Sequence, residues 1–293
     1  MEQVISKAGL TATISDHAGR LSRLTANGDD LIVPWPENDG FPPGFHGAVL
    51  FPWPNRLDKG RFRWRGSTYQ VPLNEPAREN ANHGFAFQTV WDVVETQPAY
   101  VTLRYQTPRK ASFPSRLQLD LTYEVETGLD VTAVVTNVGD VSAPYGLGFH
   151  PWLSPGRFSL DECRVQASLA AWVRADQRLL PLAEDPVPQE FDFAEGRSLT
   201  GAILDDGFVA AEPRTVRLQR PDGTAVECWM DAPFTCWQLT TGDFDSLGAL
   251  KRAGFAAEPM TCTANALATG KRLRSLEPGH AETLKWGVRL ARL

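Results

Sequence analysis

Four side chains able to move protons or hold polar ligands lie on segments that proline or glycine constrains. His150 stands between a phenylalanine and a proline in LGFHPWLS, and His83 is followed directly by a glycine. Arg56 follows a Pro-Asn pair, and Glu258 ends a small apolar run and precedes a proline. Two imidazoles and a carboxylate without an obvious nucleophile form a set suited to general acid–base catalysis.

Each of these residues also has a plainer explanation when it is taken alone. A histidine between aromatic residues, such as His150, suits a packed core, and His83 suits a turn. Arg56 suits a surface charge, and Glu258 suits a solvated strand end. Only their occurrence together favours chemistry over packing.

The patterns of several other kinds of site are absent from the sequence. No serine or cysteine lies in a G-x-S-x-G elbow, so acyl transfer lacks support. There is no H-E-x-x-H pattern, and the four cysteines have no metal-ligand spacing, so no metal is expected. Neither a P-loop nor a G-x-G-x-x-G stretch after a strand occurs, and we expect no cofactor.

The composition favours a folded chain with a substantial core. Of 293 residues, 42% are hydrophobic and 22% are charged. The net charge is −6 and no block of lysine and arginine occurs, so neither nucleic acid nor an anionic membrane is expected as a partner. No apolar run approaches the roughly 20 residues of a membrane helix. Without a secretion signal at the start, we expect a soluble, cytoplasmic protein with reduced cysteines.

Strand patterns dominate the chain. Residues 116–125 alternate strictly between apolar and polar types, and residues 129–138 continue that period after a short break, which predicts an antiparallel hairpin. Residues 215–230 predict a second hairpin around Pro-Asp-Gly, and residues 282–293 predict a strand at the end. Helical signal is confined to two short segments, 243–255 and 263–268. No linker or repeat divides the sequence, so we predict an all-β protein, a large antiparallel β-sandwich formed as a single domain over 1–293.

Five short motifs in a fixed order resemble the aldose 1-epimerase, or galactose mutarotase-like, family. The resemblance runs from about residue 45 to the C-terminus. It implies the large β-supersandwich of that family, in agreement with the strand patterns. The motifs are Pro-Asn-Arg (54–56), Asn-His-Gly (82–84), Phe-His-Pro-Trp (149–152), Leu-Asp-Asp-Gly-Phe (204–208) and Ala-Glu-Pro (257–259).

The resemblance implies a role for each matching residue. Glu258 matches the base that removes the proton from the anomeric O1 hydroxyl, and His150 matches the acid that protonates the ring oxygen. His83 matches a second histidine near that oxygen. These roles imply a protonated His150 and an ionised Glu258 in the resting protein, and a bell-shaped pH profile. The residues expected to bind the sugar are Arg56, Asn82, Asp205 and Trp152.

Two assignments stay open at this level. Asp205 aligns best with the hydroxyl-binding acid, with Asp206 and Asp231 as alternatives. Trp53 and Trp237 are alternatives to Trp152 for stacking on the sugar ring.

The function that the resemblance implies is interconversion of the α and β anomers of an aldohexose or related sugar, with a small sugar as the partner. Galactose mutarotases carry Tyr-Phe-Asn after the acid histidine, whereas this chain has Pro-Trp-Leu, which looks more like the sulfoquinovose mutarotase branch. One alternative is therefore an anionic sugar, a hexose 6-phosphate or sulfoquinovose, held by Arg56 with Lys59, Arg61 or Arg63. Another is a non-catalytic carbohydrate-binding domain, and the oligomeric state stays open.

Overall fold

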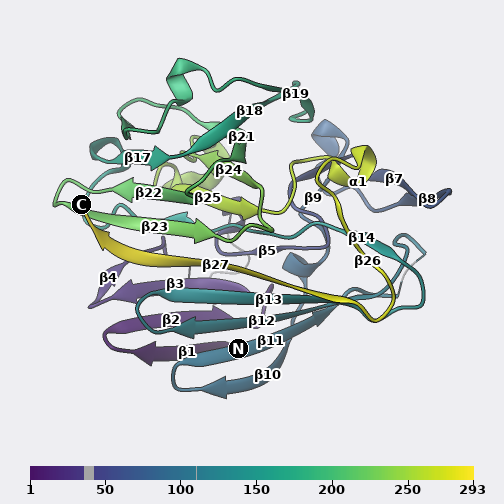
Figure 1. Ribbon diagram of the computed structural model, residues 1–293. Helices are drawn as coiled ribbons and strands as arrows, with labels where there is room; N and C mark the ends of the chain where they lie inside the picture. The colour runs from purple at the N-terminus through teal and green to yellow at the C-terminus, as the bar shows by residue number, and fades with distance from the viewer. Residues whose placement is uncertain (36–42, 110) are drawn as a thin grey trace.

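Antiparallel strands form the framework of the computed structural model, which describes residues 1–35, 43–109 and 111–293 (Figure 1). All pairings in the largest sheet are antiparallel. The C-terminal strand β27 lies in the middle of this sheet, between β13 and β23. In spatial order the nine strands are β10 (Asp92–Gln97), β11 (Tyr100–Gln106), β12 (Leu117–Val125), β13 (Leu129–Asn137), β27 (Ala281–Arg292), β23 (Thr224–Met230), β22 (Thr215–Gln219), β17 (Arg164–Ala167) and β20 (Arg197–Ser198).

Two further sheets contact this large sheet. A four-stranded sheet meets it through β11 and β12, and an eight-stranded sheet meets it between β25 and β23. The first contains β1 (Glu2–Lys7), β2 (Leu10–Ser15), β3 (Arg20–Ala26) and β4 (Asp29–Asp30). The second runs β19 (Pro181–Asp185), β18 (Leu169–Ala175), β21 (Asp205–Ala210), β24 (Cys236–Thr240), β25 (Phe255–Met260), β15 (Gly148–Phe149) and β5 (Val49–Leu50), with β16 (Trp152–Leu153) also paired to β25.

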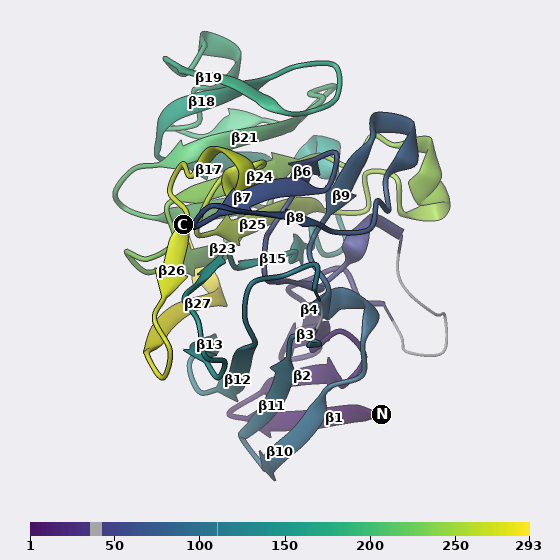
Figure 2. The same cartoon turned by 90° about the vertical axis from the view of Figure 1, so that its right-hand side faces the viewer.

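Figure 2 shows these two smaller sheets at opposite ends of the molecule, with β1 and β2 at the bottom and β18 and β19 at the top. The prediction of an all-β protein with a large antiparallel sandwich is confirmed.

The rest of the described chain consists of small hairpins and short helical turns. The two-stranded sheets are β6 (Arg56–Asp58) with β9 (Asn80–Asn82), β7 (Arg61–Trp64) with β8 (Ser67–Gln70), and β14 (Ala143–Tyr145) with β26 (Arg274–Leu276). Helical turns are η2 (Pro43–Phe45), η3 (Pro76–Arg78), η4 (Ala86–Gln88), η5 (Leu160–Glu162), η6 (Gln189–Phe191), η7 (Asp245–Leu250) and α1 (Ala266–Thr269). The last two confirm the predicted short helical segments.

The apolar alternation in the sequence places the core. Every second residue of β12, from Leu117 to Val125, is fully buried, while the residues between them face outward and are half-buried or exposed. The predicted hairpin is confirmed, since β12 pairs with β13 through Leu121 opposite Ala133. The hairpin of β22 and β23 is also confirmed.

One hydrophobic cluster collects residues from β1 to β27, including Trp237 and Trp286. The interpretation of residues 1–293 as one domain stays a prediction. In the described part of the chain, no helix is long and apolar enough to cross a membrane.

Replacing Leu121 with alanine tests how far β12 supports this core. Leu121 is fully buried, so the variant should lose about 2–5 kcal/mol of unfolding free energy through lost contacts and the cavity left behind. Urea unfolding followed by tryptophan fluorescence measures that loss. The exposed Glu124 on the same strand is the control, and Glu124→Ala should change stability by less than about 0.5 kcal/mol. Equal stability of the two variants would contradict this account.

Candidate active site

A cleft of about 250 Å³ opens at the eight-stranded sheet, and side chains from distant parts of the chain line it. Strands β25, β24 and β21 form its floor, and the segments after β9 and β15 form one wall. All seven site residues predicted from the sequence line this cleft: Arg56, Asn82, His83, His150, Trp152, Asp205 and Glu258.

His150 and Glu258 are in direct contact at the cleft. His150 Nε2 lies 3.3 Å from Glu258 Oε1, and the two side chains are only 7% and 3% exposed. Phe45 stacks near the imidazole on the cleft side at 6.0 Å between ring centroids, and Trp152 lies nearly parallel to it at 5.7 Å. An acid and a base are therefore held together in a pocket with aromatic walls.

The backbone explains why the imidazole lies beside the carboxylate. Strand β15 pairs with β25 at Met260, and β16 pairs with it again at Ala256, so the ladder is interrupted beside Glu258. Pro151 lies in this interruption and has no N–H to donate. On its other side His150 continues the pairing of β15 with β5, since its N–H donates to the Ala48 carbonyl at 3.0 Å.

His83 is held in one neutral tautomer. Its backbone is left-handed, with φ of 64°, and the following Gly84 also has a positive φ, 75°. A side chain at Gly84 would place its Cβ 2.2 Å from the Phe51 carbonyl oxygen, so only glycine fits this close approach. The Asn55 backbone N–H donates to His83 Nδ1 at 3.2 Å, which leaves the ring proton on Nε2.

The imidazole of His83 is a donor directed at the cleft rather than a base. Its ring centroid lies 5.9 Å from that of His150. Burial lowers the pKa of His83 well below its ordinary value, and the nearby His150 and Arg56 add to the fall. The ring therefore stays neutral at neutral pH.

Burial shifts the pKa of both members of the acid–base pair. Burial raises the pKa of the Glu258 carboxyl well above its ordinary value, with Asp205 adding to the rise and Arg56 opposing it. Burial also lowers the pKa of His150 to about 3, with His46 adding to the fall. Burial therefore opposes both charges of the expected resting pair, a protonated His150 and an ionised Glu258, which stays a prediction. Local sequence does not reveal that both groups are withdrawn from water, which disfavours both charges.

Part of the Arg56 guanidinium is already hydrogen-bonded within the protein. Its Nε and Nη2 donate to the two carboxylate oxygens of Glu75 at 2.9 and 3.1 Å, and Nη1 points to Asn55 Oδ1 at 3.4 Å. Burial alone would raise the pKa of Glu75, but the paired Arg56 holds it below its usual range. Glu75 thus remains ionised and fixes the plane of the guanidinium, which leaves Nη1 as the better placed donor to a ligand.

Asn82 retains free hydrogen-bonding capacity in its side chain. Asn74 satisfies its backbone, through a bond from the Asn82 N–H at 2.6 Å and a bond to the Asn82 carbonyl at 2.9 Å. The side-chain Oδ1 is buried without a hydrogen-bond partner among the described residues. A buried acceptor of this kind favours a ligand that donates.

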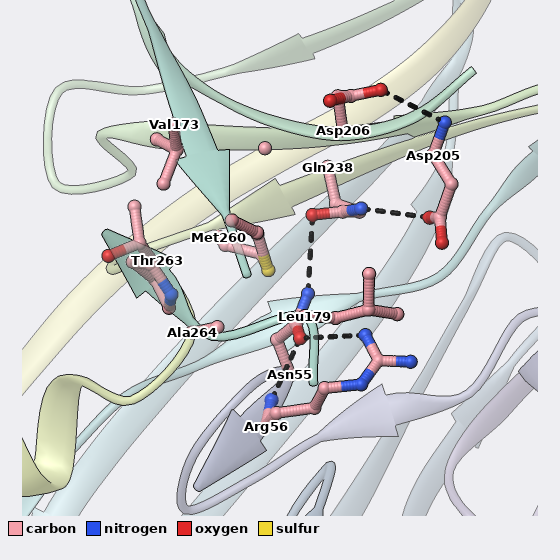
Figure 3. A pocket seen from close by; sticks show the side chains of 13 residues that line it. Asn55, Arg56, Val173, Leu179, Asp205, Asp206, Gln238, Met260, Thr263 and Ala264 are labelled. Atoms are coloured by element: carbon pink, nitrogen blue, oxygen red, sulfur yellow. Dashed lines mark hydrogen bonds between the residues drawn. The ribbon is translucent and has the colours of Figure 1, made fainter. Parts of the chain in front are cut away.

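A chain of amides fixes Asp205 (Figure 3). Asn55 Nδ2 donates to Gln238 Oε1 at 3.2 Å, and Gln238 Nε2 donates to Asp205 Oδ1 at 2.9 Å. The second carboxylate oxygen of Asp205 remains available to the cleft. These residues also border a smaller cavity of about 40 Å³ on the side of Val173 and Met260.

The structure separates the three candidate aspartates by location. Asp205 lines the cleft. Asp206, the next residue along β21, turns its carboxylate away from that of Asp205 and accepts a hydrogen bond from Trp172 Nε1 at 2.8 Å (Figure 3). Asp231 accepts a bond from the Lys285 backbone N–H and lines neither cavity.

The three candidate tryptophans are also separated. Trp53 and Trp237 belong to the main core and do not line the cleft. Trp152 lines it but is only 2% exposed, because its ring stacks on His46 at 4.6 Å between centroids and its Nε1 donates to the Gly44 carbonyl. Phe244, which also lines the cleft, is 40% exposed.

The predicted cationic cluster does not form at the cleft. Arg61 and Arg63 do point the same way, as exposed residues on either side of the buried Phe62. Neither they nor Lys59 lie among the cleft-lining residues of the described chain. The second arginine at the cleft is Arg78, whose Nη1 donates to Glu75 at 3.1 Å.

Several cleft residues have no motif that would have identified them from sequence. Gln238 lies opposite Glu258 in the pairing of β24 with β25, a long-range relation. In the sequence, only its place in a predicted strand indicates where Gln238 could lie. Glu75, Arg78 and Phe244 lie in irregular segments, where sequence periodicity carries no information. In the described residues, no three His, Cys, Asp or Glu side chains are placed to hold a metal ion.

The comparisons with known proteins agree with this architecture. The uncharacterized protein YihR of Escherichia coli K12 is 30% identical over 280 residues, 94% of this chain and 89% of that protein. The uncharacterized protein YphB of the same organism is 26% identical over 294 residues, 98% of this chain and 97% of that protein.

Solved structures share the fold at lower identity. A galactose mutarotase-like protein from Clostridium acetobutylicum superposes with a TM-score of 0.87 at 21% identity, over 100% of this chain and 98% of that one. Galactose 1-epimerase from Lactobacillus acidophilus gives 0.83 at 17%, over 99% and 94%. The sequence profile of the aldose 1-epimerase family matches residues 2–289. This protein therefore belongs to the aldose 1-epimerase family.

Proposed function

We propose that this protein is a cofactor-independent mutarotase, which interconverts the α and β anomers of a free aldohexose or a related sugar. The observation that carries the proposal is the buried contact between His150 Nε2 and Glu258 Oε1 at 3.3 Å. Around this pair the cleft offers amide, carboxylate and guanidinium groups, which suit the hydroxyls of a sugar. Membership of the aldose 1-epimerase family supports a sugar epimerase.

The reaction needs two proton transfers at one acetal carbon. Glu258 takes the proton from the O1 hydroxyl, the C1–O5 bond breaks, and His150 delivers a proton to O5. His83 donates its Nε2–H toward the same ring oxygen and stabilises the charge that develops there. Rotation about C1–C2 presents the other carbonyl face, and closure with the roles reversed gives the other anomer.

In an uncharged pair, which burial favours, the Glu258 carboxyl holds the proton that the acid needs. Transfer of the Glu258 proton to His150 converts the pair into a carboxylate and an imidazolium, which are the base and the acid of ring opening. Sugar hydroxyls that donate to Glu258 favour the carboxylate form, because hydrogen bonds to the charged species stabilise it. Substrate binding therefore favours the active charge distribution.

A sugar that carries an anionic group is a second candidate substrate. Arg78 lines the cleft together with Arg56. Its guanidinium donates to a carboxylate through Nη1 alone, to Glu75. The Pro-Trp-Leu run at 151–153 supports the same candidate through its resemblance to the sulfoquinovose mutarotase branch. A planar guanidinium suits a phosphate or sulfonate.

Replacing Glu258 with glutamine should abolish most of the activity. The amide cannot accept the O1 proton, so the rate of anomer exchange should fall by about 10²–10⁴-fold. Polarimetry or exchange NMR on freshly dissolved sugar measures it. The control is Glu195→Gln, a change at an exposed carboxylate outside the cleft, which should keep the wild-type rate. Equal rates for Glu258→Gln and the wild type would reject this mechanism and favour a carbohydrate-binding domain without turnover.

The pH dependence of kcat/KM should be bell-shaped with an unusually low acid limb. Activity needs one proton on the pair, so the acid limb marks addition of a second proton to His150, whose pKa burial lowers to about 3. The alkaline limb marks loss of the proton from Glu258, whose pKa burial raises. Initial rates corrected for spontaneous mutarotation provide the measurement. An acid limb centred near pH 6.5 would show that His150 titrates as an ordinary imidazole and would contradict this description.

Substrate comparison decides between neutral and anionic sugars. Anomer exchange is measured for glucose, galactose, glucose 6-phosphate and sulfoquinovose with the wild type and with Arg78→Ala. If the substrate is anionic, the variant should raise KM for that sugar about tenfold, because a charge-assisted hydrogen bond is lost. KM for glucose should then change little. A wild type that acts on neutral sugars alone, with no effect of Arg78→Ala, would reject the second candidate.

A further inference from the structure

Arg178 lies outside the cleft, at the tip of the β18–β19 hairpin. Its side chain connects this tip to residues 78–80. Its Nε donates to the Arg78 carbonyl at 2.9 Å, and its Nη2 donates to the Glu79 carbonyl at 3.2 Å and to Asn80 Oδ1 at 3.3 Å. Its Nη1 lies 2.8 Å from Asp58 Oδ1. One guanidinium therefore joins two segments that are far apart in sequence.

The connection continues to the sugar-binding side of the cleft. Asn80 is fully buried, and its Nδ2 donates both to the Arg178 carbonyl at 2.9 Å and to Glu75 Oε2 at 3.1 Å. Glu75 in turn holds Arg56 through two hydrogen bonds. The hairpin tip and the Arg56 guanidinium therefore share one continuous set of partners.

The hairpin tip is also fixed within itself. Asp176 Oδ1 accepts from the backbone N–H groups of Arg178 and Leu180 at 2.8 and 2.9 Å. Leu179 lies between them with a left-handed φ of 59°, which a leucine adopts only where its surroundings enforce it. Its side chain lines both the cleft and the adjoining small cavity, where it lies near Arg56 (Figure 3).

We propose that Arg178 is a positioning residue that holds Leu179 as the apolar wall over the hydroxyl-binding side of the cleft. The inference rests on the proposed mutarotase function and adds a specificity element to it. Arg178 does not line the cleft, and neither its side chain nor Leu179 makes a hydrogen bond to His150 or Glu258. Its removal should therefore weaken sugar binding and leave the proton transfers intact.

The test compares three variants by steady-state mutarotation. Arg178→Ala should raise KM by about tenfold to a hundredfold through a displaced wall, with kcat retained, and Arg178→Lys should lie between it and the wild type. The matched control is Arg174→Ala, which removes an exposed ion pair with Asp185 on the same hairpin. KM of the control should equal that of the wild type. An unchanged KM in Arg178→Ala, or a loss confined to kcat, would overturn the inference.

A fourth variant distinguishes the role of the Leu179 side chain from that of Arg178. Leu179→Gly removes the side chain at a position where glycine is at ease with the positive φ, so the fold should hold while KM rises as in Arg178→Ala. An unchanged KM here would overturn the inference even if Arg178→Ala were unstable.

Hydrogen exchange provides a readout that does not depend on activity. The backbone N–H groups at positions 178 and 180 should exchange faster in Arg178→Ala than in Arg174→Ala, because the hairpin tip loses the side-chain hydrogen bonds of Arg178. Equal exchange would overturn the inference. A wild type that fails to turn over any sugar would instead contradict the proposed function, and the exchange measurement would still decide the role of Arg178.

Discussion

The site depends on an interruption in the strand ladder beside Glu258. Strand β25 is paired on one side with β24 without a break, while on the other side β15 and β16 pair only with its two ends. Proline at position 151 has no N–H to donate to β25 and contacts it only through its carbonyl, which accepts from the Ala257 N–H at 3.2 Å, while the His150 N–H continues the pairing with β5 at Ala48. The imidazole thereby reaches the carboxylate, and the regular strands on either side hold both at a fixed separation.

Burial then sets the chemistry of the pair. Phe45 and Trp152 flank the imidazole, and the sheet floor covers the carboxylate, so that water can stabilise neither charge. Burial therefore opposes the charge on each group, raising the pKa of Glu258 and lowering that of His150. The same withdrawal from water strengthens every hydrogen bond that a bound sugar would make there. The burial that the fold imposes on His150 and Glu258 thus sets the environment in which the proposed proton transfers take place.

The hydroxyl-binding residues of the cleft are oriented by side-chain hydrogen bonds. Asn55 and Gln238 orient Asp205, and Glu75 orients Arg56. Beyond the short ladder of β6 with β9, polar side chains such as Arg178 and Asn80 supply connections between these segments.

The sequence by itself determined many of the strands and seven of the residues that line the cleft. Alternation in β12 and β13 is a property of neighbouring residues, so it is readable without the fold, and the ordered motifs identified seven residues that all line one cleft. Tertiary structure decided the rest: Asp205 rather than Asp206 or Asp231 faces the cleft, Trp152 is too buried to stack by its face, and Arg78 rather than Arg61 or Arg63 lies beside Arg56. It also decided that both His150 and Glu258 are buried, which raises the pKa of Glu258 and lowers that of His150. These properties depend on burial and on pairings between segments far apart in sequence, which no local pattern records.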